Sequence, residues 1–516
     1  EGASPTHLIP PPPSAGAFVF HYNEVRDTIM AWTNPVADLL PQPGNTLFVN
    51  GRWEPTASGA TFDVDNPSTG ETLFAVSDGT TEDATRALDS AASTAEAWAA
   101  SSPIERRTVL EAAYEAVMDN KAIFAELMTR EMGKTYKEAL GEVNYGAGFL
   151  KWFAEEAMRA YGRTFHLPDG RKGLVTHDPV GPCYLVTPWN FPLAMGTRKV
   201  GPALAAGDTA VIKPASATPL TTIALIEVLR QAGVPAGVVN LVTSKHSTAI
   251  SNTLLDDPRL RKISFTGSTS VGKALMARAT NQVLRTSMEL GGNAPFIVFD
   301  DADMDKAVEG VLLAKFRNNG QACTAANRIL VQNGIAPTFV AKLKAAVEDF
   351  TVGDGMDEGV DVSALINEQA VERMERIVAD AVDHGATLVA GGHRDGHGPC
   401  FFEPTVLDNV PRDAEVFTDE IFGPVLPISR FDTDEEGMAA ANDTVFGLAF
   451  YAFTTSIKRS EWVQRHAQAG VLAINSGVLS DASVPFGGVK QSGVGREGGA
   501  EGIYEYMNTK YTLVVS

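Results

Sequence analysis

The chain has 516 residues, a length that points to a folded protein of several domains. Hydrophobic residues make up 44% of it and charged residues 20%, which excludes a chain that is disordered throughout. The formal net charge of −21 excludes nucleic acid and anionic membrane surfaces as expected partners, because an acidic surface repels phosphates. The sequence has no run of 18 apolar residues, so we expect no membrane span.

The three cysteines, Cys183, Cys323 and Cys400, are too few and too scattered for a disulfide framework. Their small number favours a reducing compartment, and we predict a cytoplasmic protein. Residues 1–43 include four consecutive prolines and lack a basic segment followed by an apolar one. We interpret them as an appended or processed extension without chemistry, partly extended and partly helical around residues 22–40.

The rest of the chain predicts an α/β fold. Residues 81–132 are Ala-rich, with apolar residues at helical spacing, and Gly133 follows as a typical C-terminal cap. Short apolar runs then recur at nearly equal intervals, at residues 183–187, 209–213, 238–242 and 262–266. Helical patterns separate them, which predicts a parallel sheet of the kind that binds nucleotides at the carboxyl ends of its strands. In the clearest helix, Thr218 is the expected N-cap, Pro219 the first helical residue and Gly233 the residue just past the end.

A second α/β block is predicted from residues 294–299 onward, with its last strand at 425–431. Residues 164–180 contain a Pro-Asp-Gly turn between β-prone flanks and predict a hairpin. The tail at residues 511–515 is β-prone as well. Exposed strands such as these favour pairing with another subunit.

Seven short segments contain residues suited to catalysis or cofactor binding: TPWNFP (187–192), KPAS (213–216), FTGSTSVG (265–272), MELGGN (288–293), FRNNGQAC (316–323), EIFGP (420–424) and PFGGVKQSG (485–493). Cys323 lies in a loop beyond a predicted helix, where it is either a nucleophile or a buried small hydrophobe. Glu289 is either a general base with a raised pKa or an ordinary ion-pair partner. Asn190 follows a strand, where it either donates to an oxyanion or forms a turn.

In this order, the seven segments resemble those of the aldehyde dehydrogenase superfamily over residues 47–514. The resemblance implies that Cys323 is the nucleophile, Glu289 the base and Asn190 the oxyanion-hole side chain. It also implies a cofactor site that consists of Thr187, Trp189, Asn190, Lys213, Pro214, Ala215, Ser216, Gly267, Ser268, Leu290, Glu420 and Phe422.

The family fold implies a Rossmann-type cofactor domain of residues 44–163 and 181–290, followed by an α/β catalytic domain of residues 291–505. Residues 164–180 and 506–516 would form a small β oligomerisation element, and we expect a homodimer or homotetramer. The implied reaction passes through a thiohemiacetal and a thioester on Cys323 and requires no metal. His393, His397 and Cys400 have metal-like spacing, but their Gly-rich stretch offers no fourth ligand, which favours an exposed loop over a zinc site.

Ser216 bears on the choice of cofactor. Where family members have Glu after Lys-Pro-Ala, that Glu binds the adenosine ribose and repels a 2′-phosphate. Ser216 lacks the charge and lies close to Lys213 in sequence. We therefore predict NADP⁺ as the preferred cofactor, with NAD⁺ also possible; the alternative is that Ser216 simply permits both.

Residues 153–157, 197–207, 293–303 and 315–318 resemble succinate-semialdehyde dehydrogenases, in which two arginines and a serine hold the distal carboxylate of the substrate. The matching positions here are Arg198, Arg317 and Ser480. Arginine offers a bidentate fork to a carboxylate, although either residue could instead form a structural ion pair. Ala325 stands where some relatives have a second cysteine, so a redox lock of that type is excluded.

Three further possibilities remain open from the sequence. Glutarate semialdehyde, or a broad range of aldehydes, would be alternative substrates of the same chemistry. A non-catalytic protein on the same fold is the third, and the joint presence of Cys323, Glu289 and Asn190 disfavours it.

Overall fold

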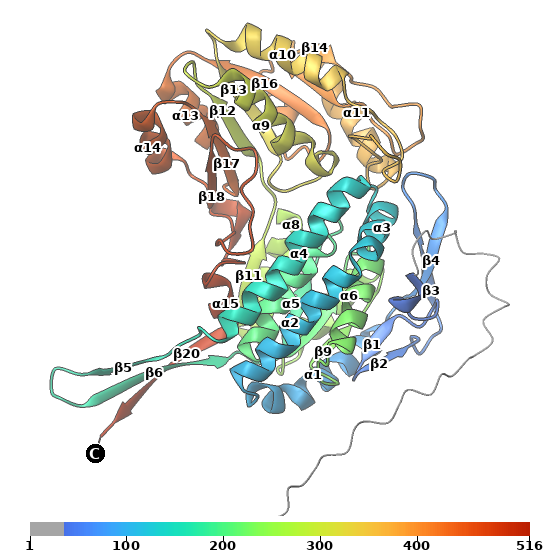
Figure 1. The fold of residues 1–516 in the computed structure, drawn as a ribbon, viewed down its shortest axis with the longest axis vertical. Coiled ribbons are helices and arrows are strands. Elements are labelled where there is room, and N and C mark those ends of the chain that lie inside the picture. Colours follow the sequence, from blue (N-terminus) through green and yellow to red (C-terminus); the bar gives the residue numbers. More distant parts are fainter. Residues whose placement is uncertain (1–35, 516) are drawn as a thin grey trace, which may run out of the picture.

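The computed structural model describes residues 36–515, so the predictions for residues 1–35 lie outside the described part. Two α/β bodies, each built around its own sheet, lie next to each other, and a long arm projects from the first (Figure 1). The described chain begins with the short 3-10 helix η2 (Val36–Asp38). A separate hairpin of β3 (Thr61–Asp65) and β4 (Thr72–Ser77) flanks the first body. The α/β fold class is confirmed.

The first sheet has eight strands in the order β19-β11-β10-β7-β8-β9-β1-β2, of which β11, β10, β7, β8 and β9 run parallel. The bounds are β1 (Leu47–Val49), β2 (Arg52–Glu54), β7 (Cys183–Val186), β8 (Ala210–Lys213), β9 (Val239–Leu241), β10 (Lys262–Thr266), β11 (Arg285–Glu289) and β19 (Gly493–Val494). The four predicted strands are therefore confirmed as parallel neighbours, in a sheet that antiparallel strands extend at both edges. Their carboxyl ends share one edge, where the predicted Asn190 and Lys213 segments emerge.

Helices cover both faces of this sheet. One hydrophobic core contains residues of α2 (Pro103–Asp119), α3 (Lys121–Met132), α4 (Tyr136–Ala157), α5 (Ala194–Ala206) and α6 (Leu220–Gln231). A second core contains residues of α1 (Thr81–Ala99), α7 (Ser247–Asp256) and α8 (Thr269–Ala279). The short 3-10 helix η3 (Thr280–Gln282) follows α8. The stretch predicted as helical is thus divided into α1, α2 and α3. Ser102 caps α2, and Gly133 ends α3 in the left-handed region at φ 91°.

The predicted N-cap of α6 is wrong. Pro219, not Thr218, occupies the cap position and offers no side-chain bond, while the Thr218 hydroxyl donates to the carbonyl of Trp189. The carboxylate of Glu131 in α3 instead accepts hydrogen bonds from the backbone N–H groups of Leu220 (2.7 Å) and Thr221 (2.8 Å). A buried acid from another helix therefore provides the cap, which sequence spacing within α6 could not reveal.

The second sheet has the order β14-β15-β16-β13-β12-β17-β18 and is parallel except for the β14–β15 pair. Its elements are β12 (Ala294–Val298), α9 (Met304–Phe316), η4 (Arg317–Gly320), β13 (Ala326–Gln332), α10 (Ala336–Glu348), α11 (Glu368–Asp383), β14 (Thr387–Ala390), β15 (Thr405–Asp408), α12 (Glu415–Thr418), β16 (Val425–Phe431), α13 (Asp434–Asn442), β17 (Ala449–Phe453), α14 (Ile457–His466), β18 (Val471–Ile474) and η5 (Lys490–Ser492). The chain then returns to the first sheet through β19.

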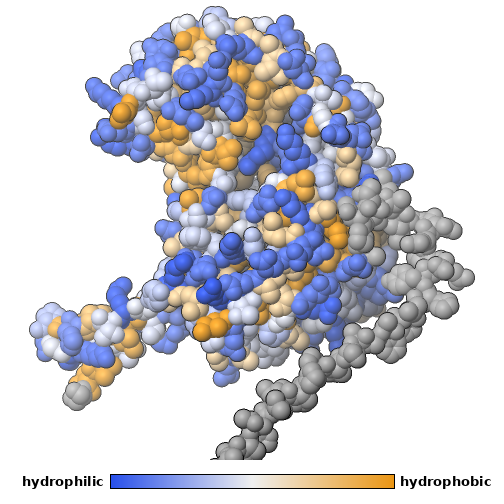
Figure 2. Space-filling view, viewed as in Figure 1, coloured by the Kyte–Doolittle hydropathy of each residue, from blue (hydrophilic) through white to orange (hydrophobic). Residues whose placement is uncertain are grey.

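The arm consists of three antiparallel strands in the order β20-β6-β5. Their bounds are β5 (Arg163–His166), β6 (Lys172–Pro179) and β20 (Met507–Val514), and α15 (Glu501–Tyr504) precedes β20. The predicted hairpin and β-prone tail thus pair with each other. Hydrophobic surface is visible on the arm (Figure 2). The exposed side chains of Tyr511 and Val514 belong to its strand β20.

Within residues 36–515, none of the helices is both long and apolar enough to cross a membrane.

Candidate active site

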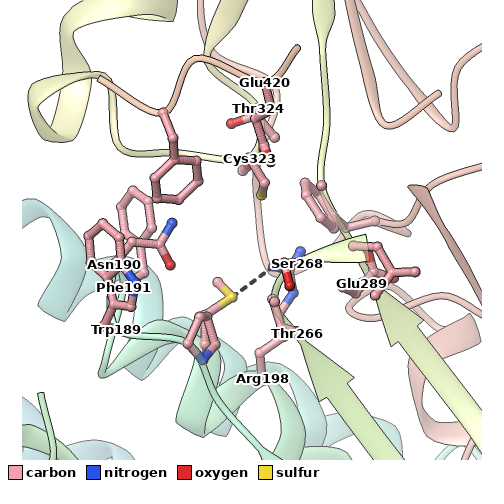
Figure 3. A pocket seen from close by; sticks show the side chains of 18 of the residues that line it. Trp189, Asn190, Phe191, Arg198, Thr266, Ser268, Glu289, Cys323, Thr324 and Glu420 are labelled. Atoms are coloured by element: carbon pink, nitrogen blue, oxygen red, sulfur yellow. Dashed lines mark hydrogen bonds between the residues drawn. The ribbon is translucent and has the colours of Figure 1, made fainter. Parts of the chain in front are cut away.

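A cavity of about 250 Å³ lies at the carboxyl edge of the first sheet, where loops of the second body meet it (Figure 3). Many of the predicted site residues line it: Trp189, Asn190, Arg198, Gly267, Ser268, Glu289, Leu290, Arg317, Cys323, Glu420, Phe422 and Ser480. The topology therefore gathers residues from distant parts of the chain around one space.

Cys323 enters this cavity from the loop between η4 and β13, and its sulfur points into the open space (Figure 3). The residue is partly exposed, whereas Cys183 and Cys400 are buried. Desolvation raises the pKa of the Cys323 thiol to about 12; the negative charge of Glu420 adds to the rise, and Arg198 opposes it. The resting thiol is therefore protonated at neutral pH and needs a base to become a nucleophile.

Glu289 is the last residue of β11 and is 3% exposed. Neither carboxylate oxygen has a hydrogen-bond partner within the described residues. Burial raises the pKa of Glu289 well above its usual value, and the nearby charge of Glu497 raises it further. These are the properties of a carboxylate that can accept a proton near neutral or alkaline pH.

Asn190 lies in the loop between β7 and α5, and its amide is directed toward the cavity (Figure 3). The amide Nδ2 donates to the carbonyl oxygen of Gln321 (3.0 Å), in the segment that leads to Cys323. A primary amide has two N–H groups, so one hydrogen remains for an oxygen in the cavity. Asn190 thereby combines a fixed orientation with a free donor, as an oxyanion hole requires.

The predicted cofactor residues fall into two groups. The first group lies at the carboxyl ends of β7 and β8, outside the cavity, and consists of Thr187, Lys213, Pro214, Ala215 and Ser216. The two strand ends are joined there, because the N–H of Thr187 donates to the carbonyl of Lys213 (3.2 Å). The others line the cavity, and Ser268 also caps α8 by accepting a bond from the N–H of Val271. The two groups share one sheet edge.

Lys213 is 2% exposed, and burial lowers its pKa to about 8. Its ammonium donates to the carbonyl oxygen of Pro214 (3.3 Å), a weak arrangement for a buried amine. Ser216, in contrast, is partly exposed in the loop beyond β8. The pair offers a cation and a neutral hydroxyl to an anionic group bound along this edge.

Glu420 and Phe422 come from the loop between α12 and β16. The Glu420 carboxylate accepts a hydrogen bond from the N–H of Gly292 (3.0 Å), and burial raises its pKa to about 7. Phe422 has a left-handed backbone (φ 55°), and its ring meets Trp189 edge to face, with the ring centres 5.3 Å apart. Strain of this kind in a non-glycine residue is typical of functional sites.

Arg198, Arg317 and Ser480 all reach the cavity, as predicted, although Arg198 also forms an ion pair. Its Nε lies 3.2 Å from Glu497, its Nη1 contacts the sulfur of Met195 (3.6 Å; Figure 3), and its Nη2 has no partner among the described residues. Arg317 lies over the ring of Phe191, 5.4 Å from its centre. Two guanidinium groups therefore approach one small cavity.

Sequence reasoning missed several residues at or next to this cavity, and two of them are ionisable. Tyr145 of α4 lines the cavity, and desolvation raises the pKa of its hydroxyl, against the opposing effects of both arginines and a hydrogen bond with Ser480. Glu497 binds Lys199 (2.6 Å) as well as Arg198, at a buried position next to Glu289. Only the helical spacing of Tyr145 from Phe149 and the Gly-rich setting of Glu497 were visible in the sequence, and neither indicates a site.

The described residues contain no group of three or more His, Cys, Asp and Glu side chains arranged to hold a metal ion. His397 instead contacts Asp395, and Cys400 packs against Phe401 in a small apolar cluster.

Comparison with known proteins agrees with this geometry. The model of the aldehyde dehydrogenase family matches residues 53–512. Succinate-semialdehyde dehydrogenase of Paenarthrobacter nicotinovorans is 52% identical over 441 residues, which are 85% of this chain and 98% of that protein. Glutarate-semialdehyde dehydrogenase of Pseudomonas aeruginosa is 46% identical over 466 residues, 90% of this chain and 96% of the other.

A solved structure described as an E. coli NADP dependent enzyme superimposes with a TM-score of 0.91 at 45% identity, covering 93% of this chain and 99% of that one. The family match and these identities extend over both bodies and the residues around the cavity. The chain belongs to the aldehyde dehydrogenase family.

Proposed function

We propose that the protein oxidises succinate semialdehyde to succinate with NADP⁺ as the preferred cofactor. The observation that carries the proposal is the approach of Arg198 and Arg317 to the cavity that contains Cys323. On a protein of net charge −21, two cationic side chains in one pocket provide the local positive charge that captures a carboxylate. The name of the Paenarthrobacter relative supports the same substrate.

In the proposed mechanism, Cys323 attacks the aldehyde carbon and transfers its thiol proton to a base. The amide of Asn190 and the backbone N–H of Cys323 stabilise the resulting oxyanion. Bound NADP⁺ would supply the acceptor for the hydride that leaves the same carbon. Glu289 then takes a proton from water, which attacks the thioester on Cys323 and releases the acid. Aldehyde, water and NADP⁺ thus yield carboxylate, NADPH and two protons.

Several unpaired polar groups fit a dinucleotide at this edge. Among the described residues, the hydroxyls of Thr187 and Thr266 are buried without hydrogen-bond partners, and the Lys213 ammonium donates a hydrogen bond to a backbone carbonyl alone. A Cβ atom at Gly291 would lie 2.7 Å from a Glu420 oxygen, so this glycine allows the Glu420 carboxylate to approach the backbone closely at the cavity. We infer that Lys213 and Ser216 hold the adenosine side and that Glu420 and Phe422 hold the nicotinamide side.

Replacing Ser216 with Glu is expected to reverse the cofactor preference. The new carboxylate would repel a 2′-phosphate and accept hydrogen bonds from free ribose hydroxyls. We expect the ratio of kcat/KM for NADP⁺ to that for NAD⁺ to fall about 10- to 100-fold, since one lost charge-assisted contact costs roughly 1.5–3 kcal/mol. Initial rates of absorbance increase at 340 nm with each cofactor measure it.

Ser216→Ala is the matched control, because it removes the hydroxyl without adding charge. Its ratio should change far less than that of Ser216→Glu. A wild-type enzyme whose KM for NADP⁺ exceeds that for NAD⁺ tenfold would refute the preference itself.

Replacing Arg317 with Ala tests the substrate. We expect KM for succinate semialdehyde to rise about 10- to 100-fold while kcat/KM for butanal changes less than about twofold, because only the former has a carboxylate to lose its partner. Arg465→Ala, at an exposed position on α14, makes the same change in net charge and should alter neither. If Arg317→Ala impairs the oxidation of both aldehydes equally, Arg317 does not bind the substrate carboxylate.

Glutarate semialdehyde is the second candidate, supported by the name of the Pseudomonas relative. It bears the same carboxylate one methylene further from the aldehyde. A comparison of kcat/KM for the two semialdehydes in the wild-type enzyme distinguishes the candidates, and Arg317→Ala should impair both.

We further propose that the arm joins subunits into a homodimer or homotetramer. β20 and β5 are the outer strands of its sheet, and an outer strand offers unpaired backbone groups to a neighbouring chain. The exposed apolar residues Tyr511, Leu513 and Val514 support the same role.

A further inference from the structure

The proposed oxyanion hole joins two loops that belong to different sheets. Asn190 follows β7 of the first sheet, and Cys323 precedes β13 of the second. Stabilisation of an oxyanion requires its donors to be held within a fraction of an ångström of the correct positions. The two loops contact each other directly through Asn190, Asn318 and Gln321, and further contacts that hold both loops to one helix would fix their relative position more firmly.

Helix α4 contacts both loops through one face. Glu138 and Glu142 are four residues apart and so lie on the same side of the helix. One oxygen of Glu138 accepts a hydrogen bond from the backbone N–H of Asn318 (2.8 Å), five residues before Cys323. In Figure 1, one end of α4 reaches the boundary between the two bodies.

Glu142 holds the other loop. One of its oxygens accepts hydrogen bonds from the N–H groups of Leu193 (3.0 Å) and Ala194 (3.1 Å), at the start of α5. The residue at the N-cap of α5 makes no side-chain bond of its own, so Glu142 supplies the cap. The segment that begins with Asn190 is thereby anchored to α4.

Lys134, between α3 and α4, completes the connection. Its ammonium is 1% exposed, pairs with the second oxygen of Glu142, and donates to the carbonyl oxygen of Asn190 (2.8 Å). Asn318 Nδ2 donates to the same Asn190 carbonyl (3.1 Å) and to that of Gln321 (2.9 Å). The peptide of Asn190 is thus bound from both sides of the boundary.

The loop on the Cys323 side needs such support. Asn318 and Asn319 both have left-handed backbone conformations, at φ 58° and 56°. Two consecutive non-glycine residues in this region are strained and persist only where surrounding contacts hold them. The bond from the Asn318 N–H to Glu138 is one of those contacts.

We propose that Lys134, Glu138 and Glu142 are positioning residues that hold Asn190 in register with Cys323. The proposal rests on the proposed roles of Asn190 and Cys323 and is independent of which aldehyde is the natural substrate. The three side chains act through Asn190 and Asn318 rather than on the substrate itself.

The test is a double-mutant cycle between Lys134 and Asn190. Lys134→Met removes the donor to the Asn190 carbonyl and is expected to slow the pre-steady-state burst of NADPH formation with butanal about 10-fold or more, by analogy with other groups that orient a site. Asn190→Ala removes the oxyanion donor directly. If Lys134 acts through Asn190, the double variant should be no slower than Asn190→Ala by more than about twofold.

Glu131→Gln is the matched control for buried charge. Glu131 caps α6 as Glu142 caps α5, and it contacts neither proposed loop. We expect a lower Tm and a burst rate within about twofold of wild type. If the burst of Glu131→Gln is slowed as much as that of Lys134→Met, general destabilisation explains both results and the proposal fails. If the rate losses of Lys134→Met and Asn190→Ala multiply in the double variant, the two residues act independently, which also overturns the proposal.

A second variant covers the case in which Lys134→Met does not fold because Glu142 is left as a buried unpaired charge. Lys134→Met/Glu142→Gln removes both charges and keeps an acceptor for the Leu193 and Ala194 N–H groups. A folded double variant with a slow burst supports the positioning role. A wild-type burst rate in that variant would contradict it. Loss of activity toward succinate semialdehyde alone would concern the substrate proposal only.

Discussion

Replacing Cys323 with serine is expected to abolish aldehyde oxidation, with a loss of at least roughly 1,000-fold in kcat, as for other covalent nucleophiles. Serine preserves the volume, but an alcohol is a far weaker nucleophile than a thiolate and its ester is a poorer intermediate. The cavity supplies a buried environment that already raises the pKa of the thiol to about 12, and it would disfavour an alkoxide even more. Steady-state NADPH formation measures the loss.

The other cysteines provide the control. Cys400→Ser changes the same atoms at a buried position in a separate apolar cluster. Its kcat should stay close to that of the wild type even if its Tm falls. If Cys323→Ser retains more than a tenth of the wild-type activity, Cys323 is not the nucleophile. The same conclusion would follow if the intact mass of the wild-type enzyme shows no substrate adduct after the reaction is quenched.

Replacing Glu289 with glutamine should separate the two halves of the reaction. The neutral amide of the Glu289→Gln variant could not take a proton from water, so the thioester on Cys323 would persist. We expect kcat to fall about 100- to 10,000-fold while a burst of about one NADPH per active site remains, in line with the contribution of a general base. Stopped-flow absorbance at 340 nm, with mass spectrometry of the acyl-enzyme, measures both quantities.

The pH dependence follows from the raised pKa of Glu289. The ionised form is the active base, and burial together with Glu497 shifts its ionisation to higher pH. Steady-state turnover of the wild type should therefore rise with pH through the pKa of Glu289, and the rise should be absent from Glu289→Gln. Glu131→Gln, which makes the same chemical change at a helix cap, should retain it. If Glu289→Gln loses the burst of NADPH as well as steady-state turnover, Glu289 instead acts in the attack of Cys323 on the aldehyde.

The sequence was sufficient for features that are local or that follow from strand order. Residues 262–266 were predicted as a buried parallel strand, and parallel strands place their following loops at one edge. This explains why Asn190, which follows β7, and Gly267, which follows β10, meet at one cavity. Strand β11, which ends at Glu289, was not among the predicted strands. The assignment of roles within that cavity came from the family resemblance of the seven segments, and those roles remain proposals.

The sequence was insufficient where a partner comes from another element. Lys262, Ser264 and Thr266 alternate along β10 and interrupt an otherwise apolar strand. Ser264 in fact contacts Lys199 and Glu497, which lie 65 and 233 residues away. The capping of α6 by Glu131, and of α5 by Glu142, has the same origin. No periodicity or cap motif within one segment encodes such contacts, because packing alone brings the partners together.

The desolvation of the Cys323 thiol has a consequence for the enzyme between turnovers. Peroxides and alkylating agents react with the thiolate, and a thiol whose pKa is raised to about 12 holds almost none of that form at neutral pH. Ala325 offers no thiol with which an oxidised Cys323 could form a protective disulfide. Because a protonated thiol reacts slowly with these agents, the idle enzyme is expected to be oxidised more slowly than one that rests with a thiolate.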